Sequence, residues 1–166
     1  MEKVKINKLN FSESKELFEK CCGATGWING MVSSKPFNSN EELLLTAEKI
    51  WYSLNKEDWL EAFSYHPEIG DIDSLKKKFS SGKKLAEEEQ SGAANASKET
   101  LVDLAKYNEN YKKKFGYIFI VCATGKSADE MLSIIKDRIT NEPEQEIKIA
   151  MGEQNKITKL RLDKLL

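Results

Sequence analysis

Residues 40–51, NEELLLTAEKIW, indicate the fold more clearly than any other stretch of the chain. Five apolar side chains recur there at intervals of three and four residues: Leu43, Leu44, Ala47, Ile50 and Trp51. That spacing places them on one face of an α-helix, and Asn40 is a residue type that often begins one. The stretch therefore predicts an amphipathic helix that packs its apolar face against a core.

Similar patterns continue on both sides of this stretch, bounded by residues that typically begin or end helices. The expected boundaries are Ser12 or Ser14 to Gly23, Asn55 as the cap of the segment with Trp59 and Phe63, Ser97 to Gly116, Ser127 with Glu130 as a capping box, and Pro143 in the first turn of the last helix. Roughly eight helices with short connections result. We therefore predict an all-α, single-domain helical bundle over residues 1–166.

One apolar run, residues 117–123 or YIFIVCA, does not show helical periodicity. Its β-branched and aromatic side chains favour a buried extended segment. No second run of this kind is present to pair with it, so we do not expect a sheet. Its backbone N–H groups then need other partners, and a ligand is one candidate.

The composition is that of a globular protein, with 40% hydrophobic residues among 166. The 26 basic and 27 acidic side chains nearly cancel, which disfavours nucleic acid and anionic membranes as partners. The three cysteines, Cys21, Cys22 and Cys122, lack the spacing of a zinc site or a disulfide framework. No apolar run of about 20 residues predicts a membrane span, and we expect a reducing, cytoplasmic location.

His66 is the only histidine, and it lies in the motif YHPEIG at residues 65–70. Its imidazole is the side chain best suited to exchange protons near neutral pH. Pro67 disfavours a helical conformation at the preceding residue, so the helix carrying Trp59 and Phe63 should end there. His66 is therefore a candidate acid or base at a helix exit, and the alternative is a surface or packing role.

Two further groups of polar side chains include candidates for binding. Glu89 and Gln90 place a carboxylate beside an amide, a pair suited to the N–H and C=O groups of a urea-like ligand; the alternative is a solvated acidic turn. Gln154 and Arg161 share an apolar stripe of the last helix. A guanidinium placed there needs an anion, either a carboxylate of the protein or one of a ligand.

Residues 123–127, ATGKS, imitate the end of a phosphate-binding P-loop. The motif needs a glycine five positions before Gly125, where this chain has Ile120. Alternating strands and helices, which surround such loops, are also not predicted. We therefore interpret these residues as the connection to a helix capped by Ser127.

Together these motifs closely resemble the OHCU decarboxylase family, enzymes that act on 2-oxo-4-hydroxy-4-carboxy-5-ureidoimidazoline in urate breakdown. The resemblance extends over most of the chain and rests on four ordered motifs, at residues 58–70, 89–93, 114–123 and 153–162. It implies an all-helical carboxy-lyase, usually a homodimer, that forms (S)-allantoin from a small-molecule substrate. It also implies that no metal or organic cofactor is needed.

The resemblance assigns roles to individual residues of this chain. His66 and Glu89 would be catalytic, and the substrate would be bound by Pro67, Gln90, Arg161 and the backbone of Phe119, Ile120, Val121 and Ala123. Many family members have a serine three positions before the Glu-Gln pair, where this chain has Ala86. That departure keeps open an alternative function, a non-catalytic helical module that binds allantoin-like ureido compounds.

Overall fold

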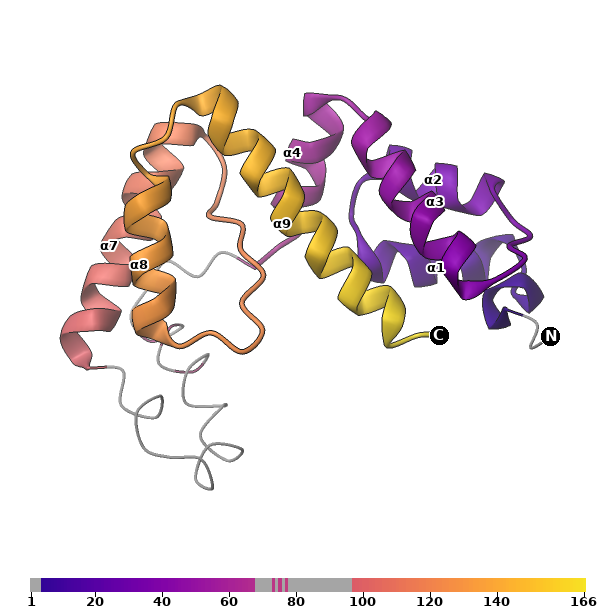
Figure 1. Ribbon diagram of the computed structural model, residues 1–166, viewed down its shortest axis with the longest axis horizontal. Helices are drawn as coiled ribbons and strands as arrows, with labels where there is room; N and C mark the ends of the chain where they lie inside the picture. Colours follow the sequence, from indigo (N-terminus) through magenta and orange to yellow (C-terminus); the bar gives the residue numbers. More distant parts are fainter. Residues whose placement is uncertain (1–3, 68–72, 74, 76, 78–96) are drawn as a thin grey trace, which may run out of the picture. The chain divides into compact units, whose positions relative to one another are not determined.

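The computed structural model describes residues 4–67, 73, 75, 77 and 97–166, and their regular structure is entirely helical (Figure 1). The elements are η1 (Lys5–Lys8), α1 (Phe11–Cys21), α2 (Thr25–Ser33), α3 (Asn40–Ser53), α4 (Lys56–Ser64), α7 (Lys98–Phe115), α8 (Ala128–Arg138) and α9 (Pro143–Asp163). No strand occurs among the described residues. The predicted all-α fold class is confirmed, and the number of helices is close to the prediction.

The chain divides into two compact units. The first consists of Met1–His66 and Met151–Leu166, and the second of Pro67–Ala150. Helix α9 contributes its first part to the second unit and the rest to the first. Each unit has its own core.

Tryptophan side chains organise the core of the first unit. Trp27 and Trp51 are fully buried, and a buried indole N–H needs an acceptor. Trp27 Nε1 donates to the backbone oxygen of Ala47 at 3.0 Å, and Trp51 Nε1 donates to that of Met151 at 3.0 Å. The first bond joins α2 to α3, and the second joins α3 to α9.

Helix α2 was not predicted from the sequence. Ala24 at its N-cap position offers no side-chain cap; instead Glu61 of α4 accepts hydrogen bonds from the backbone N–H of Thr25 at 2.8 Å and from its hydroxyl. Gly26 and Gly30 also argue against a helix locally. In the structure they allow close packing, because a Cβ at Gly30 would lie 3.0 Å from Ile50 of α3.

Most of the predicted helix ends are confirmed. Asn55 and Ser127 form capping boxes, Ser97 caps α7, Gly116 ends α7 at a φ of 83°, and Pro143 begins α9. The predicted start of α1 at Ser12 or Ser14 is wrong. Asn10 caps that helix instead, because its side chain and that of Glu13 bond each other's backbone N–H groups.

In the second unit, α7 packs against α8, and residues 117–123 connect them without regular structure. The side chains of Tyr117, Ile120 and Cys122 are buried, whereas the intervening residues are half-buried. Within the ATGKS motif, Lys126 Nζ donates to the backbone oxygen of Cys122 at 2.7 Å. Together with the Ser127 cap, this contact supports the helix-connection interpretation.

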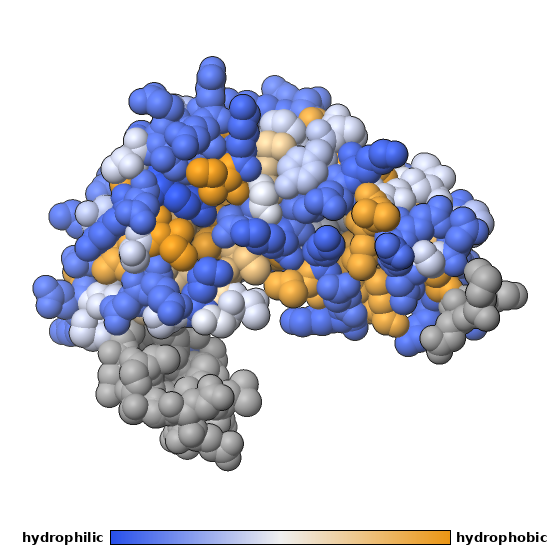
Figure 2. Space-filling model, viewed as in Figure 1, coloured by the Kyte–Doolittle hydropathy of each residue, from blue (hydrophilic) through white to orange (hydrophobic). Residues whose placement is uncertain are grey.

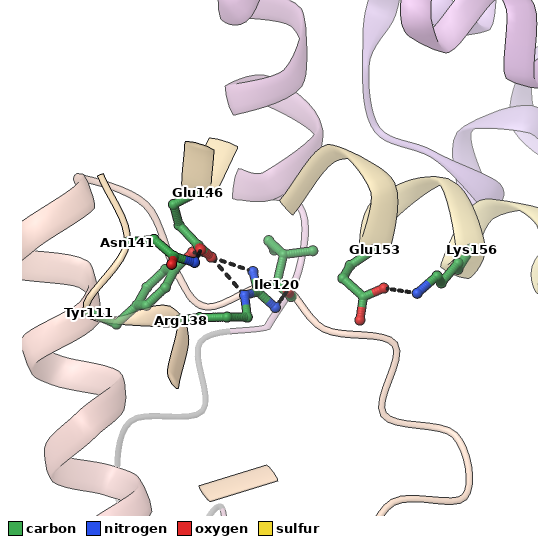
Figure 3. Close-up of polar contacts among 7 residues, drawn as sticks. All are labelled: Tyr111, Ile120, Arg138, Asn141, Glu146, Glu153 and Lys156. Atoms are coloured by element: carbon green, nitrogen blue, oxygen red, sulfur yellow. Dashed lines mark hydrogen bonds and ion pairs between the residues drawn. The ribbon is translucent and has the colours of Figure 1, made fainter. Parts of the chain in front are cut away.

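A buried ion pair anchors the second unit (Figure 3). Arg138 of α8 and Glu146 of α9 are 6% and 0% exposed, and Arg138 Nε donates to Glu146 Oε1 at 2.7 Å. Tyr111 and Asn141 donate to the same carboxylate at 2.6 Å and 3.0 Å. The other side of the guanidinium donates from Nη1 to the backbone oxygen of Ile120 at 2.7 Å.

The visible surface of both units is mostly hydrophilic, with smaller hydrophobic patches between the charged side chains (Figure 2). This distribution agrees with the 32% charged residues of the chain. Among the described residues, no helix has the length and apolar character that crossing a membrane requires.

We expect Arg138→Met to lower the free energy of unfolding by about 3–5 kcal/mol, because it leaves the buried Glu146 carboxylate without its counter-ion. Urea titration followed by far-UV circular dichroism measures this change. Lys113→Met is the control, since the ion pair of Lys113 with Glu109 at 2.8 Å is exposed and should contribute nothing measurable. Equal unfolding midpoints for the two variants would contradict the prediction.

Candidate functional site

His66 lies directly after the end of α4, as the sequence predicts. The helix ends at Ser64 with Tyr65 as its C-cap, and the backbone N–H of His66 donates to Phe63 O at 3.2 Å. Phe63 is fully buried, so this bond ties the histidine to the core of the first unit. The imidazole is half-buried, and Pro67 is exposed.

The imidazole meets a buried amide on α9. His66 Nε2 lies 2.5 Å from Gln154 Oε1, although 88 residues separate the two in sequence. Gln154 is 1% exposed, and its Nε2 donates to Thr158 Oγ1 at 3.1 Å. Because an amide oxygen only accepts hydrogen bonds, this geometry requires a proton on His66 Nε2. A neutral imidazole in this arrangement has its basic lone pair on Nδ1.

Cys21 and Cys22 are uncharged at neutral pH. Burial raises the pKa of the Cys22 thiol to about 11, in spite of a hydrogen bond from Thr158 that favours the thiolate. Burial likewise raises the pKa of Cys21 to about 11, although the nearby charge of Arg161 acts in the opposite direction. Both cysteines therefore remain thiols, and the positive charge in this part of the first unit belongs to Arg161.

Arg161 lies on the same face of α9 as Gln154, two helical turns further on. Its side chain is half-buried, and its Nη1 donates to the backbone oxygen of Cys21 at 3.2 Å. In the part of the chain that the structure describes, no carboxylate lies within ion-pair distance of it. The salt bridge considered from the sequence is therefore not found there, and a half-buried positive charge remains for an anion.

A glycine allows the residue before His66 to pack closely. A Cβ atom at Gly23 would lie 2.3 Å from Tyr65 Cγ and 2.8 Å from Tyr65 Cβ. Rotating the Tyr65 ring cannot relieve the second contact, because Cβ is fixed to the backbone. Gly23 thus sets how near the end of α4 comes to the end of α1.

Residues 119–123, the predicted backbone contacts of the substrate, belong to the second unit. Arg138 holds the carbonyl of Ile120, and the Arg138 guanidinium lies 4.7 Å from the centre of the Phe119 ring. Among the described residues, the N–H groups of Phe119, Ile120, Val121 and Ala123 donate no hydrogen bond. Four donors in a half-buried segment agree with the expectation that its amides need a further partner.

The remaining predicted positions, Glu89 and Gln90, lie outside the described residues, as does Ala86. Conversely, Gln154 contacts His66 but was not predicted as a site residue. The sequence placed this amide on an apolar stripe, which indicated burial. Its partner was not predictable, because nothing local in the sequence relates residues 66 and 154.

A sequence model of the OHCU decarboxylase family matches residues 7–163. The chain belongs to this family. The predicted family is thereby confirmed, and with it the predicted enzyme class, a decarboxylase.

Relatives of this OHCU decarboxylase family member include proteins with one and with two activities. It is 43% identical over 146 residues to the uric acid degradation bifunctional protein TTL of Arabidopsis thaliana, covering 87% of this chain and 45% of that protein. The chain thus spans less than half of that relative. It is 27% identical to the 2-oxo-4-hydroxy-4-carboxy-5-ureidoimidazoline decarboxylase of Amia calva, covering 100% of this chain and 95% of that one.

A solved structure agrees with the family assignment. It is a crystal structure of an OHCU decarboxylase in the presence of (S)-allantoin, with 41% sequence identity and a TM-score of 0.74. The match covers 91% of this chain and 96% of the other. The helical fold of this family member is therefore that of a known decarboxylase.

We expect Gly23→Ala to lower the free energy of unfolding by about 1–3 kcal/mol, because the added methyl group overpacks against Tyr65. The displaced Tyr65 should also shift His66 and reduce turnover. Gly152→Ala is the matched control: its Cβ would have no neighbour closer than 3.9 Å, and alanine in a helix should gain up to about 1 kcal/mol. Urea unfolding compares the two, and a neutral Gly23→Ala would contradict the packing argument.

The Cys22 thiol should make stability depend on alkaline pH. Its pKa rises from 9.0 to about 11 on folding, so its contribution is complete below pH 9 and is lost as the pH approaches 11, on the order of 2 kcal/mol. Cys22→Ala should therefore lose less unfolding free energy than the wild type between pH 8 and 11. Parallel stability curves for the two proteins would show that the thiol is not buried as described.

Proposed function

We propose that this chain decarboxylates 2-oxo-4-hydroxy-4-carboxy-5-ureidoimidazoline to (S)-allantoin, with His66 as the acid and base. The observation that carries the proposal is the half-buried imidazole held by Gln154, in a chain that belongs to a decarboxylase family. The substrate is the one in the name of a relative, and (S)-allantoin is present with a similar solved structure.

The reaction needs little from the protein apart from position and proton transfer. The carboxylate leaves as CO₂ from a carbon next to an imine, the electron pair of the broken bond moves toward the ring nitrogen, and that nitrogen takes up a proton. The substrate thus supplies its own electron sink, which is the chemistry a carbanion-stabilising cofactor would otherwise provide. The resulting enol-type intermediate loses its hydroxyl proton and gains a proton on the carbon that carries the ureido group. Delivery to one face gives a single enantiomer.

His66 is suited to that proton transfer by its position. Its ring is tied at one nitrogen to Gln154 and through its backbone to Phe63, so it approaches a substrate in a defined orientation. General acid and base catalysis by such a group contributes roughly 10²- to 10⁴-fold. The family resemblance assigns a catalytic role to Glu89 as well.

The family resemblance assigns binding of the polar substrate to Arg161 of the first unit and to residues 119–123 of the second. The guanidinium has no carboxylate partner among the described residues, which favours contact with the substrate's anionic or polar groups. The N–H groups of Phe119, Ile120, Val121 and Ala123 are donors for the ring oxygens. Contacts of Pro67 and Gln90 with the substrate rest on the family resemblance.

We further propose that residues 1–166 form one domain and act as a homodimer in the cytoplasm. The family match over residues 7–163 supports a single domain. Leu45 and Tyr52, seven residues apart on α3, are 58% and 48% exposed, and paired apolar side chains of this kind are typical of protein interfaces. The balanced charge and the unpaired cysteines support the cytoplasmic location.

We expect His66→Ala to lower kcat by about 10²- to 10⁴-fold while the far-UV circular dichroism spectrum stays unchanged. The substrate is generated in place from urate, and the appearance of optically active allantoin is followed by circular dichroism. Lys148→Ala, an exposed position of α9, is the control and should retain full activity.

Two outcomes would contradict the proposal. If the wild-type protein forms (S)-allantoin no faster than the uncatalysed reaction but binds allantoin in a titration, the chain is a binding module. If His66→Ala retains full turnover, the reaction does not depend on the imidazole.

A further inference from the structure

Gln154 is a buried amide with both ends in hydrogen bonds. Its oxygen faces His66 Nε2 at 2.5 Å and its nitrogen donates to Thr158 Oγ1 at 3.1 Å. Gln154 is 1% exposed and Thr158 5% exposed, so water does not substitute for either partner. Loss of one of these bonds leaves a buried polar atom unsatisfied, which is costly.

Thr158 contacts the nitrogen end of the amide. Its hydroxyl oxygen accepts from Gln154 Nε2 at 3.1 Å. The oxygen end of the amide faces the histidine.

We propose that Gln154 is a positioning residue that selects the tautomer of His66 with the proton on Nε2. The amide is neutral, so it orients the ring without the charge of a carboxylate. This inference rests on the proposed function of His66, but the state of the ring can be measured without turnover.

Nitrogen-15 NMR tests the tautomer directly, because the chain contains a single histidine. Protonated and unprotonated nitrogens of a neutral imidazole have well-separated resonances. At pH 8.5 we expect wild-type His66 to be protonated on Nε2, with a proton that exchanges slowly with water. In Gln154→Met, which keeps the size of the side chain and removes the acceptor, we expect fast exchange and a mixture of tautomers.

Turnover measurements test the consequence. We expect Gln154→Met to lower kcat about 10- to 100-fold, part of the general acid–base contribution, with KM changed less than threefold. Thr158→Val should lower kcat in the same direction, and Thr158→Ser, which restores the hydroxyl, should recover it. Gln145→Met, the same substitution at an exposed position of α9, is the matched control.

The outcomes separate this inference from the proposed function. An active wild type whose His66 is protonated on Nδ1 would overturn the inference and leave the decarboxylase function intact. Unchanged proton exchange and unchanged kcat in Gln154→Met would also overturn it. An inactive wild type with the expected tautomer would instead reject the proposed function, while the positioning of the ring by Gln154 would stand.

Discussion

The buried polar side chains of α9 constrain the rest of this structure. Glu146, Gln154 and Thr158 are each at most 5% exposed, and burial of polar groups is unfavourable unless their hydrogen bonds are satisfied. The part of α9 in the second unit holds Arg138 and Tyr111 through Glu146. The part in the first unit holds the imidazole through Gln154. One helix thus determines a polar arrangement in each unit.

Each arrangement holds polar groups in fixed positions within its own unit. In the second unit, Arg138 takes up the carbonyl of Ile120, and the N–H groups of the same segment remain as donors. In the first unit, Gln154 restrains the ring of His66, and Arg161 supplies a positive charge two turns along the same helix. The proposed decarboxylation, whose electrons move into the substrate's own imine, depends on the position of the substrate and on one proton-transfer group.

Local chemistry made much of the fold predictable. The amphipathic pattern of residues 40–51 predicted α3, and the caps at Asn55, Ser97 and Ser127 were confirmed because a cap and the N–H group it bonds lie within three residues. The predicted start of α1 was wrong, because Asn10 caps this helix and the nearby serines do not. The helix exit at His66 was predictable for the same reason, because Pro67 acts on its immediate neighbour.

By itself, the sequence determined the helical class, most helix ends, the single proton-exchanging side chain and the family motifs, because these depend on neighbouring residues or on ordered patterns. Only the tertiary structure decided the rest. Helix α2 is capped by Glu61, 36 residues away, and His66 is oriented by Gln154, 88 residues away. Such partners are brought together by the packing of whole helices. The sequence around each residue therefore does not indicate which distant residue it contacts.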